Sequence, residues 1–132
     1  IIKNLLKMFS FPIFILLAHI ILIPTGIYET YEWFDIPMHF FGGLSIAISY
    51  SKLIKYLEKE KTINKTPVEI FPVFIISFVV LTAVLWEFSE FILDLFLDIR
   101  AQGGLNDTMF DLFFGLIGGI FSFFVWKNNT NP

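Results

Sequence analysis

Four stretches of this chain carry few charged residues, and they limit its fold more than any other feature. They cover residues 5–23, 36–51, 68–86 and 109–126, and Asp111 lies inside the last of them. A helix rises about 1.5 Å per residue, so roughly 20 residues cross a hydrocarbon core about 30 Å thick. Each stretch can therefore span a bilayer if its ends extend slightly into the flanking residues.

The composition agrees with a membrane protein. The 132 residues are 56% hydrophobic with a mean hydropathy of +0.75, which is too apolar for an ordinary soluble domain. The chain has no cysteine, which excludes disulfides and thiolate metal ligands. We predict an all-α integral membrane bundle that forms a single domain over residues 1–132. Its four transmembrane helices are expected at about residues 5–23, 36–56, 68–97 and 107–126.

The lysines predict how this bundle is oriented. They all flank one side of the expected spans, and Arg100 is the one cation on the other side, which is rich in acids. The positive-inside rule then places both termini and the loop over residues 52–65 in the cytoplasm. The loop mixes lysines with glutamates, so we predict no nucleic-acid binding. The lysines are Lys3, Lys7, Lys52, Lys55, Lys59, Lys61, Lys65 and Lys127.

A group of acids stands out against the apolar background. An acid near hydrocarbon must be paired, protonated or bound to a metal, so such a group is a candidate functional site. The first three are spaced i, i+3 and i+7, which puts them on one helical face, and the third of them is expected at the water interface. The five acids are Glu87, Glu90, Asp94, Asp107 and Asp111.

Two further helices point polar groups inward. His39 follows Asp35 by four residues and shares a face with Gly43, and small residues let another helix approach closely. We therefore expect His39 inside the bundle, and we interpret Asp35 as a helix cap. Asp111 shares a face with the glycines of a Gly-x-x-x-Gly motif that ends at Gly119, so it too is expected to face inward.

Three other polar residues allow simpler interpretations. Asp107 stands at the expected start of the last helix and can either cap it or join the acid group. His19 is a lone histidine in an apolar helix, and we interpret it as packing. Tyr28 belongs to an aromatic cluster that is typical of a membrane interface, where it would serve as an anchor.

Together these residues predict a site near the outer surface. One arginine cannot neutralise five acids by ion pairing, so shared protons, a divalent metal or a cationic ligand must do so. An imidazole with several carboxylates suits Mg, Mn, Fe or Zn. A purely structural polar network is the alternative interpretation. The metal ligands that we predict are His39, Glu87, Glu90, Asp107 and Asp111, with Glu87 or Glu90 as the catalytic base.

These motifs resemble those of a known family. The segments Asp35-Ile-Pro-Met-His39-Phe, Trp86-Glu87-x-x-Glu90 and Asp107-Thr-x-x-Asp111 are similar to motifs of the VanZ-like membrane proteins, and closest to the YjdF-type branch. The resemblance covers roughly residues 34–119. It implies a multi-pass protein in the cell membrane of a bacterium or archaeon, from a family linked in some members to glycopeptide antibiotic resistance.

Three classes of function follow from the site. The first is an enzyme that acts on, or a protein that binds, a lipid-linked envelope component. The second is binding or permeation of a cation, a proton or an antibiotic without catalysis, which would require a homo-oligomer because four helices are few for a pathway. The third is an accessory role beside partner membrane subunits. In each case the lipid bilayer is the expected surrounding.

Overall fold

The computed structural model describes residues 2–97 and 102–128, and every regular element within these ranges is a helix. The all-α class is therefore confirmed for this part of the chain. Two short 3₁₀ turns, Ile23–Thr25 and Glu32–Phe34, flank the short helix α3. The helices are α1 (Ile2–Met8), α2 (Ser10–Leu22), α3 (Ile27–Thr30), α4 (Asp35–Lys59), α5 (Phe71–Leu97) and α6 (Leu105–Asn128).

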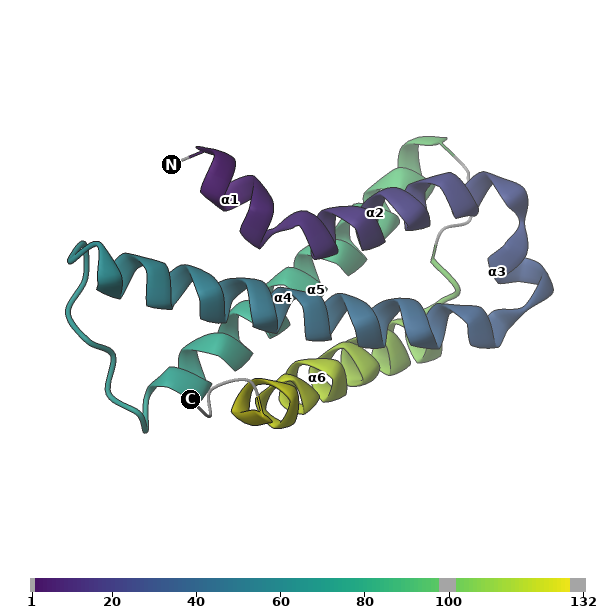
Figure 1. The fold of residues 1–132 in the computed structure, drawn as a ribbon. Helices are drawn as coiled ribbons and strands as arrows, with labels where there is room; N and C mark the ends of the chain where they lie inside the picture. Colours follow the sequence, from purple (N-terminus) through teal and green to yellow (C-terminus); the bar gives the residue numbers. More distant parts are fainter. Residues whose placement is uncertain (1, 98–101, 129–132) are drawn as a thin grey trace.

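The first predicted helix is broken in two. Helix α1 and the segment from Ser10 to Thr25 meet at an angle of 63°, on either side of Phe9 (Figure 1). Pro12 explains the break, because its ring would clash with the carbonyl of Met8 in a continuous helix and it has no N–H to donate to that carbonyl. The hydroxyl of Ser49 on α4 donates a 2.8 Å hydrogen bond to the Met8 carbonyl instead. The bend therefore leaves this carbonyl satisfied.

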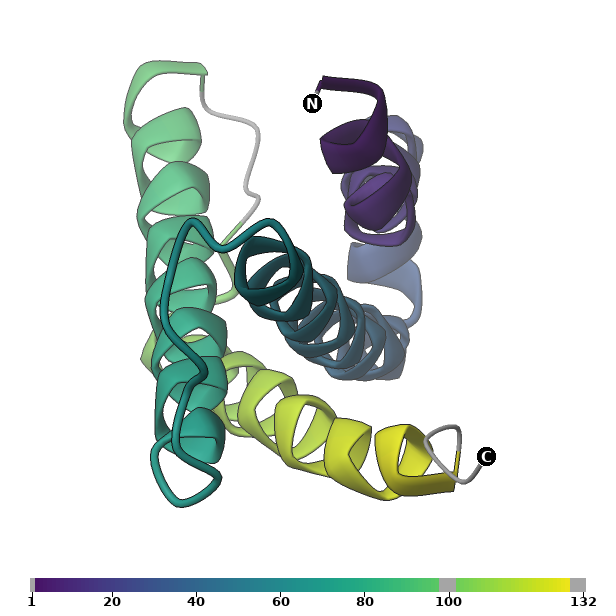
Figure 2. The same ribbon diagram turned by 60° about the vertical axis from the view of Figure 1, so that its left-hand side comes forward.

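Helix α4 is the central element. It contacts α1, α2, α5 and α6, and Figure 2 shows it between α5 on one side and the α1–α2 arm on the other, with α6 below. Its buried residues are mostly small or polar, because they face neighbouring helices rather than lipid. They are Asp35, His39, Gly43, Leu44, Ser45, Ala47, Ser49, Ser51 and Ile54.

This central position explains why four membrane spans are not confirmed. Within the described ranges, two helical segments are long and apolar enough to cross a membrane, Phe71–Leu97 and Leu105–Val125. A third qualifies if the bent pair of Ile2–Met8 and Ser10–Thr25 forms one span. Helix α4 has 25 residues and thus sufficient length. However, the polar groups on its inner face make it less apolar than a helix that faces lipid.

Glycines bring α4 and α6 into backbone contact, as the small-residue motifs predicted. A Cβ atom added to Gly43 would overlap the carbonyl oxygen of Gly115, and one added to Gly118 would overlap that of Phe40. Only glycine fits at such an approach. The crossing fixes the position of α6 against the first half of α4, which carries His39.

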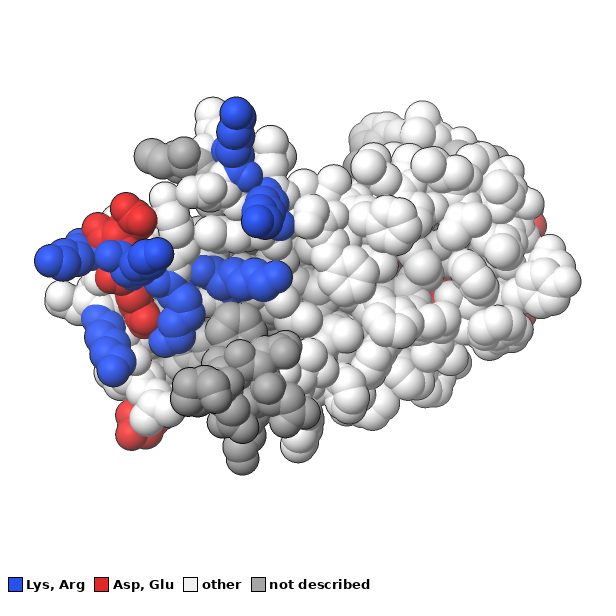
Figure 3. All heavy atoms as spheres, viewed as in Figure 1, with Lys and Arg blue, Asp and Glu red and all other residues white. Residues whose placement is uncertain are grey.

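The lysines of the described residues collect at one end of the molecule. Lysines and several acids cover the end that holds the α4–α5 connection, and the rest of the visible surface has almost no charged side chains (Figure 3). Large apolar side chains are exposed along the helices, among them Phe14, Leu81, Phe88 and Phe124. A surface of this kind is suited to lipid contact. Which face of the membrane the lysines occupy stays a prediction.

The charged end contains a pH-sensitive contact. Glu58 accepts a 2.8 Å hydrogen bond from the backbone N–H of Thr66 and a 3.0 Å bond from Lys55, and these bonds lower the pKa of its carboxyl from 4.5 to about 2. We expect the contact to be complete above pH 4.5 and to be lost as the pH falls towards 2. Carbon NMR of the Glu58 carboxyl would show a midpoint near 2, and Lys55→Met would raise it only in part. A midpoint above 4 in the parent would contradict this.

Candidate functional site

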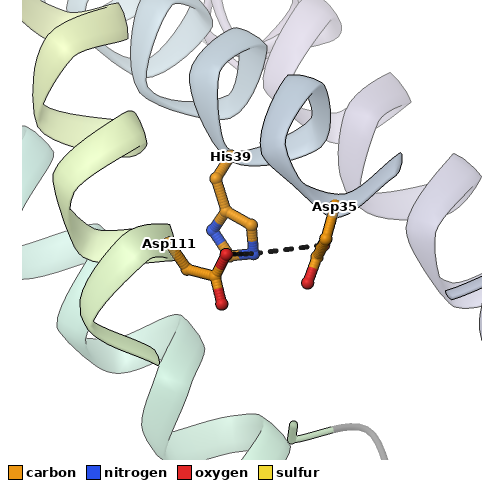
Figure 4. Close-up of side chains that lie close together, drawn as sticks. All are labelled: Asp35, His39 and Asp111. Carbon is orange, nitrogen blue, oxygen red and sulfur yellow. Dashed lines mark ion pairs between the residues drawn. The ribbon is translucent and has the colours of Figure 1, made fainter. Parts of the chain in front are cut away.

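Three side chains from α4 and α6 form the centre of the site. The imidazole Nε2 of His39 lies 3.3 Å from Oδ1 of Asp35 and 3.7 Å from Oδ1 of Asp111. Asp35 and His39 lie one turn apart on α4, and Asp111 reaches them from α6 (Figure 4). One ligand atom from each lies within 4.8 Å of the other two, so the group could hold a metal ion. We call these three residues the His39 triad.

The triad contains polar atoms that lack hydrogen-bond partners. His39 and Asp111 are buried, with 9% and 2% of their surface exposed. Nevertheless Nε2 of His39, Oδ1 of Asp35 and Oδ2 of Asp111 have no hydrogen-bond partner among the described residues. Buried polar atoms are almost always satisfied, and leaving one unsatisfied costs about 1–3 kcal/mol. The arrangement therefore has room for a further positively charged group, whether a proton or a metal.

Glu87 lies on the other side of the same imidazole ring. Its Oε1 is 3.9 Å from Nδ1 of His39, and its Oε2 is buried without a partner. This distance is too long for a hydrogen bond, but a carboxylate on the Nδ1 side can orient a histidine whose other nitrogen binds a metal once the two atoms move closer. Glu87 thus lies on the Nδ1 side of His39, where it can orient the ring. It does not lie on the Nε2 side, where Asp35 and Asp111 could share a metal ion with His39.

Glu90 belongs to a second cluster next to the triad. Its Oε1 lies 3.0 Å from Nε2 of His19 and accepts a 2.7 Å hydrogen bond from the indole of Trp86. Nδ1 of His19 lies 2.9 Å from the hydroxyl of Tyr28. The Trp86 ring contacts both histidines, with centroid distances of 4.7 Å to His19 and 6.3 Å to His39. We call Tyr28, His19, Glu90 and Trp86 the His19 relay.

The protonation of Tyr28 gives the relay a direction. Burial and the nearby carboxylates of Asp35 and Glu90 raise the pKa of the phenol above its ordinary value of 10. Tyr28 therefore keeps its proton at neutral pH and can donate to Nδ1 of His19. The other ring nitrogen, Nε2, then carries the proton that faces Glu90.

Asp107 belongs to neither group. It lies in the first turn of α6, which begins at Leu105, so it is not the N-cap that the sequence allowed; its Oδ2 instead accepts a 3.1 Å hydrogen bond from the backbone N–H of Gly103, four residues earlier. Asp94 accepts a 2.9 Å hydrogen bond from the backbone of Gln102. Arg100, the cation expected near the acids, lies outside the described residues. Of the five predicted metal ligands, the structure thus brings His39, Glu87 and Asp111 together.

Two hollows meet at the site. A pocket of about 410 Å³ lies at the end that the sequence predicts to face outward, and we call it the outer pocket. It is lined by Asp35 and Asp107, together with Tyr28, Glu29, Glu32, Gly103, Asn106 and Phe110. An apolar cavity of about 290 Å³ lies between α2, α4 and α5, and it reaches His19 and His39. The Asp35–His39 and Tyr28–His19 contacts connect the two hollows. The titratable groups therefore stand at a boundary between an acidic pocket and an apolar cavity.

Sequence reasoning missed three of these residues. Asp35 was interpreted as a cap, but it makes no capping hydrogen bond and faces His39 instead. His19 was interpreted as packing and Tyr28 as an anchor, yet they form the His19 relay. The available signal was that His19, like His39, lies near the outer end of its apolar helix, at a depth where the sequence has an excess of acids.

The fold and the site together define a helical membrane protein with a buried group of histidines and carboxylates. The chain belongs to the family described as "Predicted membrane protein (DUF2238)", whose model matches residues 4–129. This membership supports a location in a membrane. The resemblance to the VanZ-like group and its YjdF-type branch is not confirmed.

A relative from Thermotoga maritima, described as an uncharacterized protein, is 34% identical over 92 residues. The aligned region covers 69% of this chain and 46% of the relative, so it spans about half of that protein's length. No solved structure matches the chain.

Proposed function

We propose that this protein binds a divalent metal at the outer end of its membrane bundle and uses it to act on a lipid-linked envelope component. The observation that carries the proposal is the His39 triad. Three potential ligand atoms from two helices lie within 4.8 Å of one another, and the triad has buried atoms without hydrogen-bond partners. Spacings of 3.3 and 3.7 Å are what two ligands take when each lies about 2.0–2.6 Å from an ion.

The donor set favours a hard or borderline ion. One imidazole and two carboxylates suit Mg, Mn, Fe or Zn. Three protein ligands leave coordination positions for water or a substrate oxygen, as in catalytic metal sites. Such an ion would polarise a phosphate or carbonyl oxygen of the substrate. Glu87 would hold the His39 ring in place from its Nδ1 side.

The His19 relay supplies a proton acceptor beside this centre. Glu90 is a buried carboxylate whose orientation is held by Trp86 and His19, so it is suited to act as general base. Tyr28 also lines the outer pocket, so the contacts from Tyr28 through His19 link Glu90 to that pocket. Of the two acids predicted as catalytic, we therefore assign the proton transfer to Glu90.

The membrane topology completes the proposal. We infer that the α1–α2 arm, α4, α5 and α6 cross the cell membrane of a bacterium or archaeon as one four-helix domain. The concentration of lysines at one end supports cytoplasmic termini. The site then faces the outer leaflet, where lipid-linked envelope components are available.

A second candidate function is uptake of a cation or proton without turnover. The acidic lining of the outer pocket favours it, because Glu29, Glu32, Asp35 and Asp107 would attract cations towards His39. One protomer offers few helices for a pathway, so this function would require a homo-oligomer or partner subunits. Ion flux into vesicles without hydrolysis of a lipid would favour it over the enzyme.

Elemental analysis of the purified protein tests the metal site. We expect about one divalent metal per chain in the parent and at least a tenfold loss in His39→Gln and Asp111→Asn. Glu69→Gln is the control, because it makes the same acid-to-amide change at an exposed residue of the α4–α5 connection, at the other end of α4 from the triad, and should keep its metal. A folded parent without metal, or equal loss in the control, would overturn the proposal.

A further inference from the structure

The apolar cavity beside the triad is not used by the metal chemistry. It extends from Phe9, at the break before α2, along that helix to His19, which corresponds to about 15 Å. Its volume of about 290 Å³ is close to the lower end of ligand pockets, which range from about 300 to 1,000 Å³. A cavity of this shape suits a narrow, extended ligand.

The ring nitrogens of this cavity gather near one end. Among the described residues its lining contains no aspartate, glutamate, lysine or arginine. His19, His39 and Trp86 lie at the end next to the metal site, and mostly apolar side chains such as Phe9, Pro12, Ile13, Ile15, Ile46 and Val79 line the rest. The hydroxyls of Ser45 and Thr82, which also line it, donate to backbone carbonyls of their own helices. An unfilled apolar cavity loses dispersion contacts, so a hydrocarbon occupant would stabilise it.

We propose that this cavity holds one hydrocarbon chain of the lipid on which the protein acts. The lipid head would then lie at the boundary with the outer pocket, beside His19 and His39. This assignment rests on the proposed function for the chemistry at the head, whereas the tail site stands on the cavity itself.

Other occupants fit less well. A helix from a second copy or a partner is about 10–12 Å across with its side chains and is too wide for this volume. A free polar solute would find almost no hydrogen-bond partners along the cavity. Ile13 and Leu16 line it and are also exposed on the lipid-facing surface, so a chain from the bilayer can enter sideways.

Gly42 determines how much of the cavity is open. It lines the cavity, and a Cβ atom added there would meet nothing within 4 Å. Gly42→Leu should therefore fill the cavity without disturbing the packing, and leucine also favours a helix more than glycine does. Ser77→Leu is the matched control, because Ser77 is exposed on α5 outside the cavity.

Photolabelling in vesicles tests the tail site. The probe is a phosphatidic acid with a diazirine in the middle of one acyl chain, diluted into phosphatidylglycerol and phosphatidylethanolamine. We expect labels on the cavity residues Ile46 and Val79, with at least a fivefold loss in Gly42→Leu and no loss in Ser77→Leu. Labelling of the lipid-facing Phe88 should stay constant in all three proteins and serves as the internal standard.

The outcomes separate the two proposals. If Gly42→Leu is labelled at the cavity as strongly as the parent, or the cavity is labelled no more than Phe88, the tail site is overturned. Metal content is measured on the same samples and should be retained in Gly42→Leu, since Gly42 is no ligand. If the parent lacks metal but its cavity labelling depends on Gly42, the metal proposal fails and the tail site stands.

Discussion

Gly118→Ala is expected to destabilise the protein by about 3 kcal/mol, the upper end of the usual cost of overpacking. The added methyl group would overlap the carbonyl of Phe40, which is backbone and cannot rotate away. Helices α4 and α6 would have to separate. Because His39 and Asp111 lie on these two helices, their 3.7 Å contact should be lost as well, and metal binding with it.

Reversible unfolding in mixed detergent micelles would measure the free energy. Gly42→Ala is the control: it is the same substitution on α4, but its Cβ meets nothing within 4 Å. This variant should be as stable as the parent or up to about 1 kcal/mol more stable, since alanine favours a helix. Equal stability of Gly118→Ala and the parent would show that the helices do not approach as described.

Asp111→Asn is expected to stabilise the metal-free protein by about 1–2 kcal/mol while it removes metal binding. Among the described residues, Asp35, Glu87 and Asp111 each form an ion pair with the same imidazole, that of His39. Replacing one of three acids by an amide of the same size relieves their mutual repulsion and the cost of a buried charge. Sites that bind ligands commonly sacrifice stability in this way.

Unfolding with and without added Mn²⁺ would measure both effects. At 100 times its dissociation constant a bound metal raises the stability of the parent by about 2.7 kcal/mol, and the variant should gain almost nothing. His39→Gln provides the contrast, because it leaves the acids without their partner and should cost about 3–5 kcal/mol. If the metal-free Asp111→Asn variant were less stable than the parent, the three acids around His39 would not repel one another as we infer.

Much of the fold could be predicted because each helix has its own sequence signal. Apolar runs and the spacing of glycines along α4 and α6 are local properties, and they indicated the long helices and the close approach of Gly43. The break at Phe9 was missed, since Pro12 is acceptable in a first helical turn and the sequence does not show that Ser49 satisfies the freed carbonyl of Met8.

The site was predicted only as far as single helices reveal it. The i, i+4 relation placed Asp35 beside His39, and the depth of Glu87 and Asp111 brought them towards the same ring. Which carboxylate faces which nitrogen depends on how the helices are rotated against one another. That rotation is set by tertiary packing, so the sequence could not separate Glu90 from the triad or assign it to His19.

The division of the triad between two helices bears on how the protein is made. Asp35, His39 and Glu87 are synthesised before α6. These polar groups have therefore already left the ribosome when Asp111 emerges. Until α6 inserts and its glycines pack against α4, the part of the α4 surface that α6 covers in the folded protein is exposed. Docking of α6 would therefore be the late step of biogenesis, and it would complete both the fold and the proposed metal site at once.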